Sequence, residues 1–130
     1  MESFRTTRLP IPAVAVAPDG TDVRPLLQLS QGSFAHFELA PGGTSFAVAH
    51  RTVEEIWFFL AGRGEVWRKN KNHEEIVSVD ARVCLTIPLG TKFQFRCFGS
   101  QPLVFLAVTM PPWPGENEAY TVEGAWQATA

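Results

Sequence analysis

A histidine and a glutamate in an otherwise apolar stretch are the residues of this sequence best suited to chemistry. His50 and Glu55 fall between Gly42 and Gly64, in the segment GGTSFAVAHRTVEEIWFFLAGRG. An imidazole exchanges protons near neutral pH and ligates metals, and burial shifts the pKa of a carboxyl group. The pair therefore suits acid-base catalysis, or a share in a metal site.

The secondary structure around this pair has two interpretations. Thr52 and Glu55 have the spacing of a capping box, which would open a short helix ending at Gly62. Such a helix would carry apolar side chains around most of its circumference, and its β-branched and aromatic residues favour a strand. We therefore predict a strand over residues 55–60, buried on both faces, with Glu55, Trp57 and Phe59 sharing one face.

A second strand is predicted just before it, over residues 46–50. Alternation places Phe46, Val48 and His50 on one face. His50 and Glu55 would then point into the same interior from neighbouring strands, while Glu54 would point the other way. A hydrogen bond between His50 and Glu55 is the simplest structural explanation for both.

These residues resemble the two motifs of the cupin superfamily of small β-barrels. The first motif, G-x5-H-x-H-x(3,4)-E-x6-G, is matched at Gly42, His50, Glu55 and Gly62, with Val48 at the position of its first histidine. The second, G-x5-P-x-G-x2-H-x3-N, is matched at two positions and departs at three. It keeps Pro88 and Gly90, and it has Arg82, Phe93 and Cys97 where the glycine, histidine and asparagine would stand.

The resemblance covers roughly residues 30–110 and implies a cupin fold. Of the four residues that usually hold a metal in that family, this chain keeps His50 and Glu55 and replaces two by Val48 and Phe93. No cofactor is therefore expected. The alternative is a divalent metal (Fe, Mn, Zn or Ni) held by His50 and Glu55, with Cys97 as a further thiolate ligand.

Composition limits the other possibilities. With 130 residues, of which 45% are hydrophobic and 18% charged, the chain suits one compact domain. The net charge of −2 and the lack of a basic run with interleaved aromatics argue against nucleic-acid binding. Prolines interrupt the short apolar stretch of the first 20 residues, which fits neither a signal peptide nor a membrane span. We expect a cytoplasmic protein.

The remaining histidines and the cysteines are interpreted as structural. His36 alternates with apolar residues and is expected to be a surface or hydrogen-bonded histidine. His73 falls with Lys69 and Lys71 in a polar hairpin tip. Cys84 and Cys97 have no metal-binding spacing, and a cytoplasmic location disfavours a disulfide, so both are expected to be buried thiols.

Short strands with regular turn residues, and no convincing helix, predict an all-β, double-sheet jelly-roll barrel. We divide the single domain 1–130 into an N-terminal strand arm (1–25), a barrel (26–110) and an extended C-terminal tail (111–130). The expected strands cover residues 13–17, 26–29, 33–39, 46–50, 55–60, 65–68, 75–79, 83–87, 93–98 and 103–109.

Both ends of the chain have expected roles. N-terminal strands in cupins commonly lie on a partner subunit, so the resemblance implies a homodimer formed through the arm; the alternative is an arm folded on its own barrel. Prolines between Met110 and Gly115 prevent a continuing strand. Trp113 and Trp126 are expected to anchor the tail, with a lid over the barrel mouth as the alternative.

Three functions remain open, and the sequence does not decide whether the protein is an enzyme. The first is binding of a small aromatic or cyclic molecule, with His50 and Glu55 as an acid-base pair for isomerase, cyclase or lyase chemistry. The second is a metal-dependent oxygenase or isomerase, and the third a non-catalytic structural or regulatory dimer module. The predicted ligand-binding residues are Phe46, Val48, His50, Glu55, Trp57, Phe59, Phe93, Phe95 and Cys97.

Overall fold

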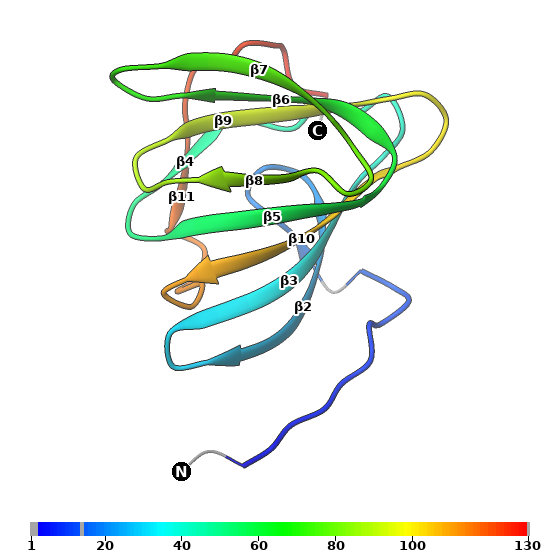
Figure 1. Ribbon diagram of the computed structural model, residues 1–130, viewed down its shortest axis with the longest axis vertical. Coiled ribbons are helices and arrows are strands. Elements are labelled where there is room, and N and C mark those ends of the chain that lie inside the picture. The colour runs from blue at the N-terminus through cyan, green and yellow to red at the C-terminus, as the bar shows by residue number, and fades with distance from the viewer. Residues whose placement is uncertain (1–2, 14, 130) are drawn as a thin grey trace.

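The computed structural model describes residues 3–13 and 15–129, and within these ranges the chain forms strands and turns without a helix. Two antiparallel sheets face each other (Figure 1). The larger has the order β1-β2-β3-β10-β5-β8 and the smaller the order β11-β4-β9-β6-β7. The strands are β1 (Ala15–Val16), β2 (Asp22–Leu29), β3 (Gly32–Leu39), β4 (Val48–His50), β5 (Glu54–Ala61), β6 (Arg63–Lys69), β7 (Glu74–Asp80), β8 (Cys84–Ile87), β9 (Lys92–Phe98), β10 (Leu103–Met110) and β11 (Ala119–Thr121).

The sandwich confirms the predicted all-β jelly roll, with differences at strand ends. β2 begins at Asp22, four residues before the predicted start, because its first half pairs with β3. The predicted strand over residues 46–50 is shorter, since only Val48–His50 is β4. Val14, inside the predicted first strand, lies outside the described residues.

The core lies between the sheets and is dominated by aromatic rings. Trp57 stacks on Phe105 with ring centroids 4.2 Å apart, and Phe95 and Phe93 meet the same tryptophan edge-on at 5.3 and 5.4 Å. Aromatic pairs in these orientations add favourable electrostatics to the apolar area that they bury. The rings fix the positions of β5, β9 and β10, which carry most of the candidate site.

β5 shows the predicted alternation, but only one of its faces is buried. Glu55, Trp57 and Phe59 face the interior, whereas Ile56 is 40% exposed and Phe58 is 42% exposed. The prediction of a strand buried on both faces was wrong. The alternation of residues in the sequence shows that a strand face is apolar. It does not show whether other residues of the chain cover that face or whether it is exposed to solvent.

Gly62 has a steric reason for its place in the motif. It has a φ of +81°, and a Cβ at this position would overlap the backbone oxygen of Pro102. Only glycine combines this conformation with such a close backbone approach. The turn between β5 and β6 therefore needs the glycine that the cupin motif places there.

The N-terminal arm runs away from the barrel before β1 pairs with β2 (Figure 1). Two described side-chain contacts join it to β2: the Arg24 guanidinium donates to Ile11 O at 2.7 and 3.2 Å, and the Arg5 guanidinium donates to Gln28 O. Phe4 is fully exposed and Ile11 is 91% exposed. The arm thus offers apolar side chains that the described part of its own chain leaves uncovered.

The C-terminal tail is tied down, as its tryptophans predict. The side-chain amide of Gln94 donates to Trp126 O and accepts from Trp126 N, and the Trp126 ring lies 4.1 Å from the Arg96 guanidinium. The tail also contains β11, which pairs with β4 and was not predicted. No helix long and apolar enough to cross a membrane occurs in the described ranges.

Candidate functional site

A cavity of about 830 Å³ opens between the two sheets at the end of the barrel where β4 meets the turn before β2. Its walls are mainly apolar, with several aromatic rings and a smaller number of polar groups. The aromatic lining comes from Phe34, Phe37, Trp57, Phe93, Phe105 and Trp113, and the polar lining includes Asp19, His50, Glu55, Thr109 and Glu116. This size and composition suit a small organic molecule.

Five of the nine predicted ligand-binding residues line the cavity, namely Val48, His50, Glu55, Trp57 and Phe93. Phe59, Phe95 and Cys97 do not. They are buried further along the same strand faces, where Phe59 and Phe95 pack on Phe105 at 5.1 and 5.3 Å and the Cys97 thiol donates to Gln101 O at 3.1 Å. The cavity occupies one end of the barrel. A residue can therefore share a strand face with the cavity residues and still lie outside the cavity, as these three do.

Phe46 was assigned to the cavity wrongly. It precedes β4 rather than belonging to it, and its side chain is 38% exposed. Its amide donates to Asp19 O at 2.9 Å, so this segment follows the loop before β2 instead of extending the strand. The alternation that we extrapolated back from Val48 therefore does not apply at Phe46.

Glu55 is a buried carboxyl held by two neutral donors. Oε1 accepts from Trp57 Nε1 at 2.9 Å, and Oε2 accepts from Thr109 Oγ1 at 2.6 Å. Burial raises the pKa of Glu55, and the two hydrogen bonds oppose that shift only in part. Thr109 stands directly opposite Glu55 in the β5–β10 register, which is how the sheet supplies the second donor.

His50 is buried against aromatic rings rather than against Glu55. Its ring meets Phe93 at 5.2 Å and Trp113 at 5.3 Å, both edge-on, and its Nδ1 has no hydrogen-bond partner among the described residues. Burial lowers the pKa of His50, with Glu118 and Asp19 acting in the opposite direction. At neutral pH the ring is therefore mainly neutral and can accept a proton or a hydrogen bond from a bound molecule.

The expected hydrogen bond between His50 and Glu55 does not form. Both carboxylate oxygens of Glu55 accept from Thr109 and Trp57 instead, as described above. The two predicted residues do share the cavity, and they reach it from β4 and β5. They can contact a bound molecule from two positions. Because they do not hydrogen-bond each other, neither directly sets the protonation state of the other.

Asp19 is a site residue that the sequence did not single out. It lies in the turn before β2, is 7% exposed, and accepts at Oδ1 from Thr21 N at 3.0 Å and from Thr21 Oγ1 at 2.5 Å. Burial raises its pKa, and Glu55 and His50 are both close enough to influence it electrostatically. The turn sequence Pro18-Asp19-Gly20 was visible, but nothing in it indicated which part of the barrel it would face.

Glu118 joins the tail to the loop that carries the site. Its side chain accepts from Thr52 N at 2.6 Å, from Val53 N at 3.2 Å and from the Thr52 hydroxyl. Burial alone would raise the pKa of Glu118, but the hydrogen bonds outweigh it and the net shift is downward. The apparent capping box at Thr52 is thus satisfied by a residue from the tail rather than by a helix.

Two assignments outside the cavity also need correction. His36 is 7% exposed rather than a surface residue, and its Nδ1 has no partner in the described part of the chain. It lies on the outer side of β3 between Arg24 and Leu106, its neighbours in register. Cys84 is exposed, because it lies on the outward face of β8, whereas Cys97 is buried as expected.

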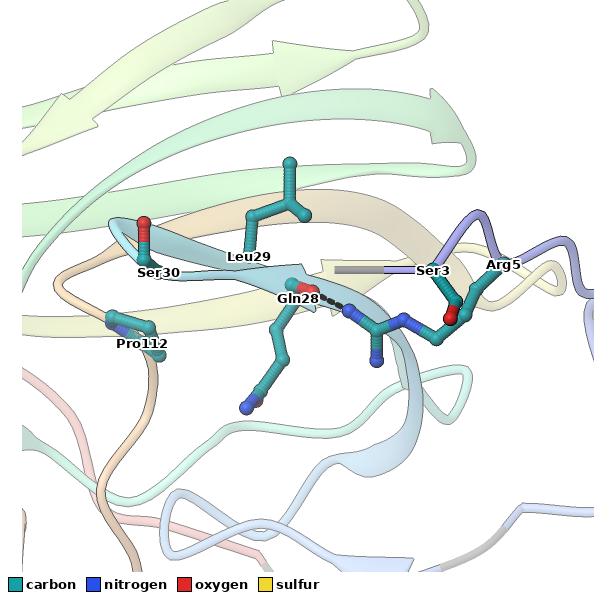
Figure 2. A pocket seen from close by; sticks show the side chains of 6 residues that line it. All are labelled: Ser3, Arg5, Gln28, Leu29, Ser30 and Pro112. Carbon is teal, nitrogen blue, oxygen red and sulfur yellow. Dashed lines mark hydrogen bonds between the residues drawn. The ribbon is translucent and has the colours of Figure 1, made fainter. Parts of the chain in front are cut away.

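The polar hairpin tip is confirmed as a solvent-exposed region. Lys69, Lys71 and His73 are exposed, and the imidazole of His73 lies 3.5 Å from the carboxylate of Glu75. A second hollow, of about 470 Å³, lies between the arm and the β2 edge and is lined by six residues, including Ser3, Arg5 and Pro112 (Figure 2). It is a shallow surface feature in which Arg5 donates to Gln28 O.

Comparison with solved structures identifies the architecture. The capsular polysaccharide assembling protein CapF from Staphylococcus aureus is 18% identical, with a TM-score of 0.68 over 85% of this chain and 31% of that one. An uncharacterized conserved protein with a double-stranded β-helix domain from Klebsiella pneumoniae is 16% identical, with a TM-score of 0.66 over 86% and 92% of the two chains.

An oxalate decarboxylase from Bacillus subtilis is 15% identical, with a TM-score of 0.70 over 82% of this chain and 29% of that one. The chain has the cupin jelly-roll fold. It spans about a third of the length of the CapF and oxalate decarboxylase chains. No family model matches the sequence, and no curated protein matches it.

The residues at the cupin metal positions offer few donors for a metal in this chain. Val48 and Phe93, which stand where the resemblance places two histidines, are Cα partners across β4 and β9, so the two missing ligands are apolar neighbours. The oxygens of Glu55 are occupied by Trp57 and Thr109. No group of three His, Cys, Asp or Glu side chains suited to a metal occurs in residues 3–13 and 15–129. The donor set does not fit a divalent ion.

Proposed function

We propose that this cupin binds a small molecule with an aromatic or cyclic skeleton in the barrel cavity. The observation that carries the proposal is the cavity itself, about 830 Å³ with aromatic walls, into which His50 and Glu55 bring two buried polar groups. A buried imidazole nitrogen without a partner is costly in an empty site. A ligand that hydrogen-bonds His50 would remove that cost.

We further propose that the bound molecule undergoes proton transfer, in an isomerase, cyclase or lyase type of reaction. The lowered pKa of His50 keeps its imidazole available as a general base. The raised pKa of Glu55 favours its protonated form more than in an exposed glutamate, so it can return a proton as general acid. Because the two groups do not bond each other, they can act at different atoms of the ligand.

Loss of the His50 side chain tests ligand binding. Small aromatic and cyclic compounds are screened by thermal unfolding of the full chain, and a saturating ligand at about 100 times its Kd should raise Tm by roughly 5–15 °C. His50→Ala should abolish that rise while the variant remains folded. His73→Ala, an exposed position on the hairpin tip, is the matched control. A His50→Ala protein that keeps the full ligand response would contradict the assignment.

We propose that the activity needs no metal. The support is the apolar Val48–Phe93 pair and the engagement of both Glu55 oxygens. The test is elemental analysis of protein purified without chelator or nickel resin, with substoichiometric metal expected. Near-stoichiometric iron, manganese, zinc or nickel would overturn this proposal and would favour the metal-dependent oxygenase or isomerase instead.

We also propose a homodimer that uses the N-terminal arm, in a cytoplasmic protein. The support is apolar surface: Phe4 and Ile11 on the arm, and Ile56, Phe58 and Leu60 on the outer face of the larger sheet, are all exposed. A contiguous apolar face of this kind is typical of an interface. The free thiols of Cys84 and Cys97 are compatible with a reducing compartment.

A further inference from the structure

The cavity is lined by carboxyl groups that have no positive partner. Its ionisable lining consists of Asp19, Glu55, Glu116, His50 and Arg5. Arg5 is the one permanent cation among them, and it is exposed on the arm, where its guanidinium donates to Gln28 O (Figure 2). Arg5 forms no ion pair with Asp19 or Glu55 among the described residues.

The hydrogen bonds of these two acids have neutral donors only. In the described ranges, Asp19 accepts from the amide and hydroxyl of Thr21, and Glu55 from Thr109 and Trp57. None of the described ion pairs includes either residue. A buried carboxylate without a counter-charge is unfavourable, and it becomes favourable when a cation is placed beside it.

The aromatic walls favour the same kind of charge. A cation is attracted to the face of a Trp or Phe ring within about 6 Å, and more strongly where water is excluded. Phe37, Trp57, Phe93 and Trp113 line the same cavity as the two acids. His50 has a buried nitrogen without a partner at the same place, which indicates that this polar side is built to receive a ligand.

We propose that the ligand of this cavity is a small organic cation, an amine or quaternary ammonium carried on an apolar ring, with its charged nitrogen beside Asp19. The inference rests on the proposed function of the same cavity and adds the charge of the ligand. Anionic ligands are disfavoured, because a carboxylate or phosphate would meet Asp19 and Glu55 without an intervening cation. Oxalate, the substrate in the name of one structural neighbour, belongs to this disfavoured class.

The proposal predicts how affinity depends on pH. Burial raises the pKa of Asp19 and of Glu55, so a bound cation favours their ionised forms and displaces protons. Affinity for a cation should rise as pH increases through these pKa values, and affinity for an anion should fall. The other titratable or charged groups nearby are His50, with its lowered pKa, Glu116 and Arg5 in the cavity lining, and Glu118, held by Thr52 and Val53.

The experiment is calorimetric titration of the full chain with three probes that share one ring: benzylamine, benzyl alcohol and benzoate. Titrations are run at pH 5.0 and 7.5 at equal ionic strength, where an alkyl amine remains protonated. Benzylamine should bind at least about tenfold tighter than either partner at pH 7.5, and its affinity should be higher at pH 7.5 than at pH 5.0. Buffers of different ionisation enthalpy should show proton release on binding.

Two variants make the test specific to Asp19. Asp19→Asn keeps an acceptor for Thr21 but removes the charge, and it should weaken benzylamine at least about tenfold while leaving benzyl alcohol within about twofold. Glu123→Gln, at an exposed position of the tail outside the cavity lining, should change benzylamine binding by less than about twofold. Equal losses for both variants would mean that general negative potential, rather than Asp19, attracts the amine, and would overturn the proposal.

The remaining outcomes separate this inference from the proposed function. If benzoate or benzyl alcohol binds at least as tightly as benzylamine and depends on His50, the cavity is a ligand site but its ligand is not cationic. If none of the three probes binds at millimolar concentration, and the wider screen of aromatic and cyclic compounds gives no Tm shift, both the inference and the proposed function fail.

Discussion

Glu55 is stabilised in an apolar interior by two hydrogen-bond donors, one from its own strand and one from the neighbouring strand. Trp57 lies two residues further on the same strand face, and Thr109 comes from the neighbouring strand β10. The carboxyl has no cationic partner among the described residues, so these two hydrogen bonds are what offsets its burial. Its protonation state therefore depends on neutral groups that a conservative substitution can remove one at a time.

Removing the Thr109 hydroxyl should destabilise the protein in a pH-dependent way. Thr109→Val keeps the shape but leaves Glu55 Oε2 without its donor, so the pKa of Glu55 should rise further. A raised acid pKa penalises folding when the group is ionised, and the penalty disappears as pH falls through the folded pKa. We expect a loss of about 1–3 kcal/mol at pH 8 and a smaller loss at pH 5, measured by denaturant unfolding.

The matched control for this prediction is Thr86→Val. Thr86 is exposed on β8, in the same sheet, so the same change there removes no described side-chain hydrogen bond. It should alter the free energy of unfolding by less than about 0.5 kcal/mol at both pH values. An equal loss at pH 5 and pH 8 for Thr109→Val would show that the hydroxyl does not act through the ionisation of Glu55.

At the scale of single elements, the tail is part of the site because Glu118 holds it there. The carboxylate accepts from the Thr52 and Val53 amides just before β5. The next three residues of the tail, Ala119–Thr121, form β11 and pair with β4. Trp113, which packs against His50, lies upstream on the same segment. We call these hydrogen bonds of Glu118 with Thr52 and Val53 the latch. By holding the tail, the latch fixes the position of Trp113 in the cavity wall.

Glu118→Gln should loosen this latch. A glutamine amide nitrogen would replace one acceptor oxygen and would face the Thr52 donors, so we expect a loss of about 1–3 kcal/mol in unfolding free energy at pH 7. The pKa of Glu118 is lowered in the folded state, so its contribution is present above its unfolded value of 4.5 and is lost as pH falls below that. Hydrogen exchange at Thr52 and Val53 should accelerate.

Glu123→Gln is the control for the latch, because Glu123 is exposed in the same tail. It should leave exchange at Thr52 and Val53 unchanged. If Glu118→Gln unfolds at the same denaturant concentration as the native chain at pH 7, the hydrogen bonds to Glu118 contribute nothing net, and another contact holds the tail.

The elements that the sequence predicted are those whose pattern is local. β5, β9 and β10 have alternating or continuous apolar runs bounded by turn residues, and all three form as expected. β11 has three residues in a tail rich in proline and glycine, and it exists because it pairs with β4, some 70 positions earlier in the sequence. Such a strand has no local signal, since its hydrogen bonds come from a distant partner.

The sequence predicted the site residues that lie on strands, where alternation determines which side chains point inward. His50, Glu55, Val48, Trp57 and Phe93 were found because alternation directs them inward. Asp19 and Glu118 come from turns and tail, where sequence gives no direction, so they were missed. Phe46 was placed inside by extending a pattern past a strand end. Cys84 was expected to be buried without an assignment of its strand face, and it is exposed.

At the scale of the whole molecule, the apolar outer face of the larger sheet and the exposed apolar side chains of the arm both favour a dimer. A stable interface buries about 800 Å² on each partner. Exposed apolar side chains of β5 and of the arm would contribute to that area. Within the described chain the arm covers little of this face, because Phe4 and Ile11 remain exposed.

We therefore expect sedimentation velocity to show a dimer of the 14.4 kDa chain at micromolar concentration. Ile56→Ser on the outer face of the larger sheet, and deletion of residues 1–11, should each raise the dimer dissociation constant at least about tenfold, because each removes apolar area from the interface. Ile76→Ser is the matched control, since Ile76 is similarly exposed but lies on β7 of the smaller sheet. It should leave association unchanged. A chain that remains monomeric at 100 µM would contradict the proposed dimer, and a dimer that responds to Ile76→Ser but not to Ile56→Ser would move the interface to the smaller sheet.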